Sequence, residues 1–222
     1  MDVKVKYENL DRLVYRKLKE MILNRQLKAG EKIIQEQLAK RMGVSRTPLR
    51  RALSQLEKEH LVEITDRGDA YVKKFSQEEI IAIYEIREVL EGLACRRAAL
   101  SIDKDKLVFF RELYKKALES VKGGNWRDYE KVDEKFHLFL IESSGISLLQ
   151  DMVKSFYVLI SRYARGLVRP PEETFAEHMA IIDALEKGDS ELAEKLVREH
   201  TQKSVKILKK QLEENRDREE RR

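Results

Sequence analysis

The chain has 222 residues, of which 38% are charged, against about 25% in an average domain. Glycine (9) and proline (3) are scarce, so we expect long helices with few sharp turns. The single cysteine excludes a disulfide scaffold and a cysteine-based zinc finger, and no apolar run is long enough for a membrane span. These features predict a soluble cytoplasmic protein with no membrane partner.

The positive charge is concentrated in the first third of the chain. Residues 1–75 contain 18 Lys/Arg and 11 Asp/Glu, a formal charge of +7. Residues 76–222 contain 27 Lys/Arg and 29 Asp/Glu, a formal charge of −2. A basic excess of this kind favours contact with a polyanion such as nucleic acid. We therefore expect the first third to bind nucleic acid and the remainder to do something else.

The first 75 residues show helices separated by glycine turns and followed by short strands. Apolar residues recur at helical spacing over residues 8–26 and 35–42, and a third helix is expected over 45–59. Gly43 supplies the turn between the second and third of these helices. The runs LVEI and AYVKKF, joined by TDRGD, are typical of a β-hairpin. Two helices around a glycine turn and a two-stranded wing indicate a winged helix-turn-helix.

The third predicted helix has a basic N-terminal end. Arg46 and Arg50 are four residues apart and so lie on one face, with Thr47 beside them. The recognition helix of a helix-turn-helix presents its N-terminal residues to base edges, where arginine can pair bidentately with guanine. The alternative is a solvated basic face on an ordinary helical hairpin, which the predicted wing and the charge asymmetry disfavour.

Residues 76–222 are predicted to form an all-helical bundle of about six helices joined by short connections. Ser76 and Glu79 have the spacing of a capping box at the start of the first helix. The buried stripe of that helix is expected to contain Ile80, Ile83, Ile86, Leu90, Leu93 and Ala94. The later helices are expected over about 103–123, 125–143, 147–167, 172–187 and from 189 onward. Past about residue 212 the apolar stripe is lost, and the tail is expected to fray.

Three of the four histidines lie on three different predicted helices of this bundle. Asp133 and His137 are four residues apart and project from one helical face. His178 precedes an apolar run, and His200 lies in the middle of the last helix. One carboxylate and three imidazoles suit zinc, nickel, cobalt or manganese, and facing helices can converge such side chains. Spacing alone leaves open that these histidines are hydrogen-bonded packing residues.

The run AGEKIIQEQLAKRMGVSRTPLRRALSQLEKEHLVEI, with RGDAYV in the wing, resembles the DNA-binding domain of GntR-family bacterial transcription regulators. The second half, with YEIREVLEGLA, DEKFH, EHMAIIDALEKGD and REH, resembles the helical effector domain of the FadR-type (FCD) branch. Together the two resemblances cover nearly the whole chain. They imply a mostly α protein, with a winged helix-turn-helix DNA-binding domain over 1–75. A metal- and ligand-binding dimerisation domain is implied over 76–222.

The resemblance assigns roles to individual positions. The implied metal ligands are Asp133, His137, His178 and His200. The implied DNA contacts are Ser45, Arg46, Thr47, Arg50, Arg67 and Gly68. The implied effector-cavity arginines are Arg87 and Arg162.

Three positions depart from the family pattern. Arg51 stands where the family usually has glutamate, and His60 stands where glycine commonly ends the recognition helix. Asp69 follows the wing glycine, where a neutral or basic residue would suit phosphate better. These departures affect the prediction of which operator sequence is bound. They do not change the prediction that the chain binds DNA.

The predicted function is a ligand-responsive transcriptional repressor that binds a palindromic DNA operator as a homodimer. Its helical domain would bind a divalent metal and a small carboxylate effector. One alternative is a metal-sensing regulator in which the ion is the signal. Another is a metal-dependent hydrolase or isomerase fused to a DNA-binding head, but no carboxylate stands out as its general base. The adjacent Glu134 and Glu177 are predicted to point to other helix faces, so we expect that the chain is not an enzyme.

Overall fold

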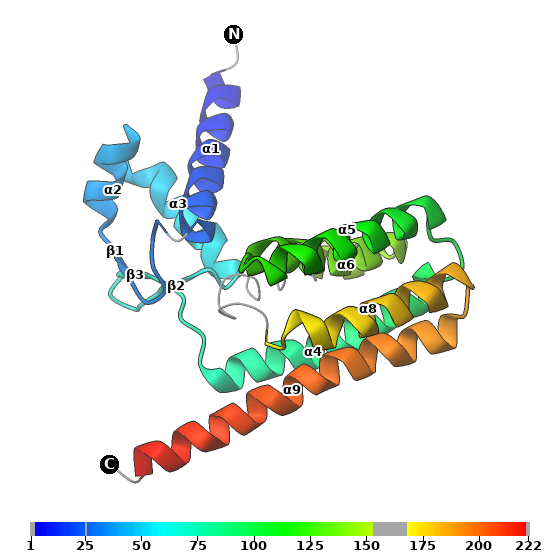
Figure 1. The fold of residues 1–222 in the computed structure, drawn as a ribbon. Helices are drawn as coiled ribbons and strands as arrows, with labels where there is room; N and C mark the ends of the chain where they lie inside the picture. The colour runs from blue at the N-terminus through cyan, green and yellow to red at the C-terminus, as the bar shows by residue number, and fades with distance from the viewer. Residues whose placement is uncertain (1–2, 25, 153–167, 221–222) are drawn as a thin grey trace. The chain divides into compact units, whose positions relative to one another are not determined.

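The computed structural model describes residues 3–24, 26–152 and 168–220. The chain divides into two compact units, Met1–Phe75 and Ser76–Arg222 (Figure 1). The first unit combines helices with a small sheet, and the second is helical throughout its described elements. Within the described residues, no helix combines the length and apolar character needed to cross a membrane.

The helices of the first unit are α1 (Val3–Leu23), α2 (Gln35–Met42) and α3 (Arg46–Lys58). Gly43 ends α2 with a left-handed φ of 67°, and its N–H bonds back to carbonyls of the last turn. Leu49, Leu53 and Leu56 of α3 are fully buried and form the core beneath α1. The predicted helix, glycine turn and helix are therefore confirmed, and Arg46 and Arg50 of α3 are exposed.

The sheet consists of β1 (Lys32–Ile33), β2 (Val62–Ile64) and β3 (Ala70–Val72), in the order β1-β3-β2. Both pairs are antiparallel, and Ala70 lies opposite Ile33 on one side and Ile64 on the other. The sequence predicted the β2–β3 hairpin and missed β1. A two-residue strand shows no alternation, so only the tertiary pairing with β3 reveals it.

The end of α3 shows how the chain turns without the family's glycine. His60 has a left-handed φ of 57°. Its N–H bonds to the carbonyl of Glu57, and the N–H of Leu61 bonds to the carbonyl of Leu56. This is the hydrogen-bond pattern of a Schellman cap, with histidine in the position that glycine usually fills.

The described helices of the second unit are α4 (Gln77–Ala98), α5 (Lys104–Lys122), α6 (Trp126–Ser143), α8 (Pro171–Glu186) and α9 (Ser190–Glu220). Residues 147–152 are also helical, and the rest of the helix predicted over 147–167 lies outside the described residues. The predicted capping box is confirmed, because Ser76 Oγ accepts from the N–H of Glu79 at 3.1 Å. In return, Glu79 Oε2 accepts from the N–H of Ser76 at 2.8 Å.

An aromatic core fills the space between α5, α6 and α8. Tyr114, Tyr129 and Phe136 are fully buried there. The ring of Tyr114 packs edge-on against both Tyr129 and Phe136, with centroids 5.4 and 5.6 Å apart. Edge-to-face pairs at this spacing add to the stabilisation from burial alone. This packing places the helix faces from which α6 and α8 project polar side chains inward.

The inward face of α4 differs from the predicted stripe. Ile83 is buried as expected, but Ile86 and Leu93 are 43% and 41% exposed. Arg87 and Glu91 take the inward positions instead. The prediction was wrong at these positions because it placed apolar residues inward and did not anticipate a buried ion pair.

The C-terminal tail was predicted to fray past about residue 212, yet α9 continues to Glu220. The extension lies alongside α4 (Figure 1), with Lys209 Nζ 2.7 Å from Glu85 and Arg216 2.7 Å from Glu78. Ion pairs between helices leave no apolar periodicity, so the sequence pattern could not anticipate this extension.

Candidate metal centre and nucleic-acid interface

Four side chains from three helices converge inside the second unit. Asp133 and His137 come from α6, His178 from α8 and His200 from α9, and one donor atom of each lies within 4.8 Å of the others. His178 Nε2 is 3.1 Å and His137 Nε2 is 3.7 Å from Asp133 Oδ1. The two Nε2 atoms are 3.4 Å apart. The structure thus brings together all four residues that the family resemblance singled out.

The second nitrogen of each imidazole is held by a neighbouring side chain. The Nδ1 contacts are His137 to Glu91 at 2.9 Å, His178 to Tyr129 at 3.3 Å and His200 to Glu177 at 2.7 Å. Partners of this kind fix the ring orientation and leave Nε2 directed at the shared centre. Sequence reasoning missed all three, because each contact joins residues that are distant in the chain or on different helices.

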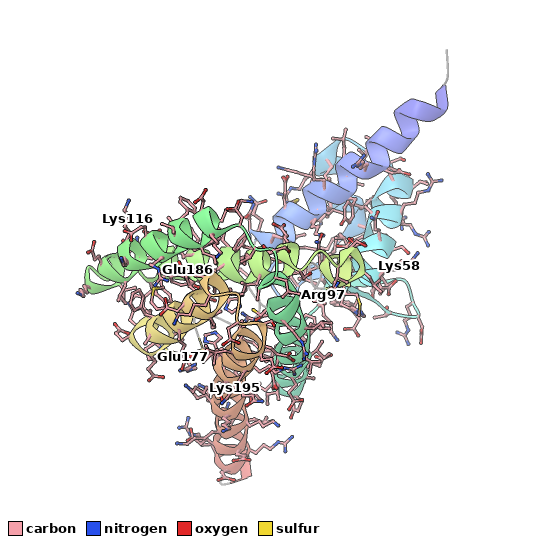
Figure 2. All side chains as sticks on the ribbon, turned by 90° about the vertical axis from the view of Figure 1, so that its right-hand side faces the viewer. Lys58, Arg97, Lys116, Glu177, Glu186 and Lys195 are labelled. Carbon is pink, nitrogen blue, oxygen red and sulfur yellow. The ribbon has the colours of Figure 1, made fainter. Side chains whose placement is uncertain are left out.

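Glu177 of α8, labelled in Figure 2, is itself tightly held. Arg169 contacts its two carboxylate oxygens in bidentate fashion, both at 2.7 Å, and Lys203 Nζ lies 2.7 Å from the same group. Glu177 was expected to point away from the candidate ligands, but its Oε2 lies 2.7 Å from Nδ1 of His200. That Glu177 precedes His178 in the sequence did not indicate its contact with His200 of α9.

Arg87 lies beside the cluster on the buried face of α4. Its Nε is 2.5 Å from Glu91 Oε1, and both side chains are buried. Because the other oxygen of Glu91 contacts His137, Glu91 bridges Arg87 to the centre. The spacing of Arg87 and Glu91, one helical turn apart, could have indicated this pair. Arg162, the other arginine expected in the cavity, lies outside the described residues.

Burial sets the protonation of the imidazoles. It lowers the pKa of His178 to about 3 and also lowers the pKa of His200, although Glu177 acts in the opposite direction. Burial disfavours the charged form of His137 as well, but the carboxylate of Glu91, with Asp133, raises the pKa of His137 above its usual value. Two of the three imidazoles are thus kept neutral, which is the form that binds metals.

Both carboxylates at the centre stay ionised. Burial tends to raise the pKa of Glu91, but Arg87 and His137 outweigh it and lower this pKa to about 2. Burial opposes ionisation of Asp133 too, but the charge of His137 and the hydrogen bonds of His137 and His178 hold its pKa well below the usual range. The centre therefore presents the buried carboxylate of Glu91, paired with Arg87, and the half-buried carboxylate of Asp133.

Tyr114 places a further polar atom at the site. Its ring stacks on His178 with centroids 4.5 Å apart. Among the described residues, its buried hydroxyl has no hydrogen-bond partner. An unsatisfied buried hydroxyl costs about 1–3 kcal/mol, so a polar group that reached this atom would remove that cost.

The residues assigned to DNA contact lie on the surface of the first unit. The exposed positions are Ser45, Arg46, Thr47 and Arg50 at the start of α3, and Arg67 and Gly68 in the turn between β2 and β3. Gly68 has a left-handed φ of 81°, and its carbonyl accepts from Gln35 Nε2 at 2.9 Å. This bond ties the tip of the wing to the start of α2. The unit therefore presents exposed cations on a helix end and on a wing tip.

Arg51 and Asp69, the two charged residues that depart from the family pattern, both form ion pairs. Arg51 lies 2.8 Å from Asp11 of α1, and Asp69 lies 2.8 Å from Lys32 of β1. The extra cation is thus drawn toward α1, and the acid at the wing tip is paired. Neither departure places an unpaired charge beside Arg46 or Arg50.

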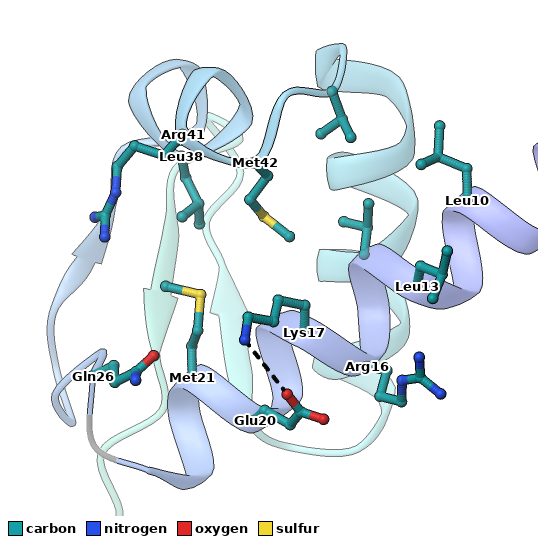
Figure 3. A pocket seen from close by; sticks show the side chains of 12 residues that line it. Leu10, Leu13, Arg16, Lys17, Glu20, Met21, Gln26, Leu38, Arg41 and Met42 are labelled. Carbon is teal, nitrogen blue, oxygen red and sulfur yellow. Dashed lines mark ion pairs between the residues drawn. The ribbon is translucent and has the colours of Figure 1, made fainter.

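A groove of about 580 Å³ opens between α1 and α2 of the same unit (Figure 3). Its apolar lining residues are Leu10, Leu13, Val14, Met21, Leu38, Met42 and Val44. Its polar lining residues are Arg16, Lys17, Glu20, Gln26 and Arg41, with Lys17 and Glu20 paired at 3.7 Å. The lining comes from α1, α2 and the segments after them, so the groove is distinct from the basic end of α3.

Both halves of the chain match known families. Residues 10–72 match "Bacterial regulatory proteins, gntR family", and residues 82–203 match the "FCD domain". The chain belongs to the GntR family. The resemblance seen in the sequence and the mostly helical, two-part fold are both confirmed by these matches.

Several relatives match this chain along most of their length. The chain is 31% identical to the uncharacterised HTH-type transcriptional regulator YdhC of Bacillus subtilis, over 91% of this chain and 92% of that one. It is 25% identical to the HTH-type transcriptional repressor RspR of Escherichia coli, over 92% and 91% of the two chains. The structure of Escherichia coli McbR/YncC has the same fold, with a TM-score of 0.69, 24% identity and coverage of 91% and 98%.

These comparisons make the protein a transcriptional regulator of the GntR/FCD type. Its family and its relatives are regulators, which confirms the expectation that the chain is not an enzyme. The α3 surface and the buried centre therefore belong to a DNA-binding domain and an FCD domain, respectively.

Proposed function

We propose that this regulator is a repressor that binds its operator as a homodimer and responds to a small carboxylate at a metal centre. The proposed ligands of a divalent transition metal are Asp133, His137, His178 and His200. The observation that carries the proposal is the convergence of these four donors with each Nδ1 already held. Two donors that share one ion at bonds of ~2.0–2.1 Å can lie at most about 4.2 Å apart, and Nε2 of His137 and Nε2 of His178 are 3.4 Å apart.

The hydrogen bonds around His178 suit a metal-binding tautomer. With a metal on Nε2, the ring proton is on Nδ1 and donates to the hydroxyl of Tyr129 at 3.3 Å. Tyr129 then donates to Thr174 Oγ1 at 3.0 Å, and Thr174 donates to the carbonyl of Pro171 at 3.4 Å. Every group in this chain is satisfied, and the Nε2 lone pair is left for the ion. Zinc, nickel, cobalt and manganese all accept this set of ligands.

The charges at the centre favour an anionic effector. A divalent ion and Arg87 would face the carboxylates of Glu91 and Asp133, which leaves one positive charge in excess. The hydroxyl of Tyr114, which has no hydrogen-bond partner in the part of the chain that the structure describes, would supply a hydrogen-bond donor to a carboxylate bound there. Such a ligand changes operator binding only if it binds one arrangement of the dimer more tightly than another. The effector we propose is therefore a small carboxylate.

The exposed end of α3 supports the proposed mode of DNA binding. A two-fold dimer presents two such helix ends to successive half-sites of a palindrome. Arg46 and Arg50 would contact base edges, and Arg67 of the wing would contact phosphate. Repression is proposed because the relative RspR is named a repressor. We also propose a cytoplasmic location, because a regulator that binds the bacterial chromosome acts there.

The metal proposal is tested by elemental analysis of protein purified without a histidine tag. We expect about one equivalent of metal per chain in the wild type and a loss of most of it in His178→Ala. The matched control is His60→Gly, which removes the one histidine outside the cluster and suits its left-handed backbone. Metal retained by His178→Ala, or absent from wild-type protein reloaded with zinc or nickel, would overturn the proposal.

The effector proposal is tested on the metal-loaded protein by measuring operator affinity against a panel of small carboxylic acids. At least one acid should shift the affinity, and Arg87→Lys should weaken that response. If no acid changes the affinity, the carboxylate effector is excluded. A large shift on chelation alone, without any organic acid, would instead favour the metal-sensing alternative.

A further inference from the structure

Arg169 lies directly before α8 and is almost completely buried. Its side chain is only 4% exposed, although its guanidinium is charged. Two prolines follow it, with Pro170 at the cap of α8 and Pro171 as the first helical residue. Proline fixes its own backbone and restricts the residue before it to extended conformations. The start of α8 therefore holds the backbone of Arg169 in place while its side chain is buried.

The guanidinium of Arg169 contacts both α8 and α9. Nη1 and Nη2 donate to the two carboxylate oxygens of Glu177, both at 2.7 Å, and Nε lies 3.5 Å from Glu173. Glu173 and Glu177 are four residues apart and so follow one face of α8. Nη1 also donates to the carbonyl oxygen of His200 in α9 at 3.4 Å. Arg169 therefore joins the two helices that supply His178 and His200.

Glu177 lies between Arg169 and His200. Its Oε2 accepts from Nη1 of Arg169 and lies 2.7 Å from Nδ1 of His200. A carboxylate held at both oxygens by one guanidinium cannot rotate without breaking two charge-assisted hydrogen bonds. The ring of His200 is thus kept with Nδ1 on Glu177, which leaves Nε2 for the shared centre.

A second set of side chains at the centre has the same order of groups. Nε of Arg87 is 2.5 Å from Oε1 of Glu91, and Oε2 of Glu91 is 2.9 Å from Nδ1 of His137. His178, by contrast, is held by the neutral hydroxyl of Tyr129. Two of the three imidazoles are therefore each held by a carboxylate that an arginine fixes in turn. Because this arrangement occurs twice on separate segments of the chain, it points to a shared role in holding the imidazoles.

We propose that Arg169 is a positioning residue of the metal centre, which acts through Glu177 to hold His200 in the orientation of a ligand before the ion binds. The proposal rests on the metal centre of the proposed function and assigns the residue that prepares one of its ligands. A ligand that is already fixed loses little side-chain freedom when it binds. Arg169 therefore raises metal affinity without contacting the ion.

Lys203 supplies a matched control, because it contacts the same carboxylate from the surface. Its Nζ lies 2.7 Å from Oε1 of Glu177, and its side chain is 53% exposed. An ammonium is a point charge without the fork of a guanidinium, and an exposed ion pair contributes about 0–1 kcal/mol. Removing Lys203 takes one cation from Glu177 but leaves the bidentate contact of Arg169. A Lys203 variant therefore separates the loss of charge from the loss of orientation.

Zinc affinity of the full-length protein, measured by competition with a chelator, tests the proposal. Arg169→Gln should weaken zinc binding about 10- to 100-fold, the usual effect of losing a residue that orients a ligand. Lys203→Gln should weaken it by less than about 3-fold. Arg169→Lys keeps the charge and loses the bidentate geometry, so its affinity should fall between those of the wild type and Arg169→Gln. Circular dichroism verifies folding, and Arg169→Lys decides the outcome if Arg169→Gln does not fold.

The cobalt-substituted protein gives a readout that a merely structural role would not change. The visible spectrum of bound Co²⁺ depends on the type and geometry of its ligands. Arg169→Gln should therefore shift the absorption bands, because His200 is no longer held in place. Lys203→Gln and the wild type should give the same spectrum.

A double-mutant cycle tests whether Arg169 acts through Glu177. Glu177→Gln keeps the shape of the side chain and removes its charge. In that background, Arg169→Gln should reduce zinc affinity by no more than about a further 3-fold, because the two residues act as one unit. Fully additive losses would overturn the route through Glu177.

The outcomes separate this proposal from the metal centre itself. A wild type that binds neither zinc nor cobalt would overturn the metal centre and the role of Arg169 together. A wild type that binds zinc, with the same affinity and cobalt spectrum in the folded Arg169 variants, would overturn the role of Arg169 alone. Equal losses of affinity in Arg169→Gln and Lys203→Gln would also overturn it, because loss of charge would then account for both.

Discussion

The two units of this regulator place their functional side chains in opposite environments. In the first unit, Arg46 and Arg50 are exposed on a helix whose apolar residues are buried beneath them. In the second unit, three imidazoles and Glu91 are buried, and their contacts join four helices. The surface residues should therefore act one at a time, whereas the buried centre should respond as a network.

The largest expected effect is that of Glu91→Ala on the stability of the FCD unit. The substitution leaves Arg87 buried without its carboxylate and frees Nδ1 of His137. Removing one partner of a buried ion pair costs about 3–5 kcal/mol. Equilibrium urea unfolding should show a loss of this size. The control, Glu88→Ala, removes an exposed contact with Gln202 and should change stability by little.

A Glu91→Ala variant as stable as Glu88→Ala would contradict the network description. It would mean that Arg87 and His137 find other partners at no cost. Measuring both variants with and without chelator separates the loss of the ion pair from any loss of metal.

Metal removal should destabilise the two units unequally. At metal concentrations 100 to 1,000 times the dissociation constant, binding stabilises the folded state by about 2.7–4.1 kcal/mol. Chelation should therefore lower hydrogen-exchange protection in α6, α8 and α9, which supply the four proposed ligands. Protection in α3 should not change. An equal loss of protection in α3 would show that the units do not respond separately.

Much of the fold follows from local sequence patterns. The glycine turn at Gly43, the hairpin and the capping box at Ser76 each depend on residues within a few positions of one another, and each was predicted. The strand β1 and the exposed side of α4 were not. Both depend on what the segment packs against, and a short or two-sided apolar pattern cannot specify that.

The candidate metal centre could likewise be predicted only in part. Residue chemistry and the family resemblance indicated Asp133 and the three histidines, whose types alone suggest metal binding. The residues that orient them were missed, because glutamate and tyrosine are common and their partners lie on other helices. Glu177, for example, contacts a histidine 23 residues away. Only the packing of α8 on α9 creates that contact.

Arg46→Ala should affect DNA binding alone. A good bidentate contact to guanine contributes about 1–3 kcal/mol of discrimination, so we expect operator binding to weaken about 10- to 100-fold per half-site. Thermal stability and metal content should match those of the wild type, because the side chain is exposed. Lys17→Ala, an exposed cation of α1, is the control and should weaken binding far less. A large fall in stability for Arg46→Ala would contradict the surface role.

The smallest effects come from two serines that begin helices in the two units. Ser76 Oγ accepts a hydrogen bond from Glu79 in a capping box, so Ser76→Ala should cost about 1 kcal/mol of stability. Ser45 occupies the same position before α3, but within the described residues its hydroxyl accepts no capping bond. Ser45→Ala should therefore leave the unfolding midpoint unchanged and lower operator affinity modestly, because its hydroxyl stays available to a DNA phosphate. If the two alanine variants lose equal stability, Ser45 acts as a cap in solution, and its hydroxyl is not reserved for DNA.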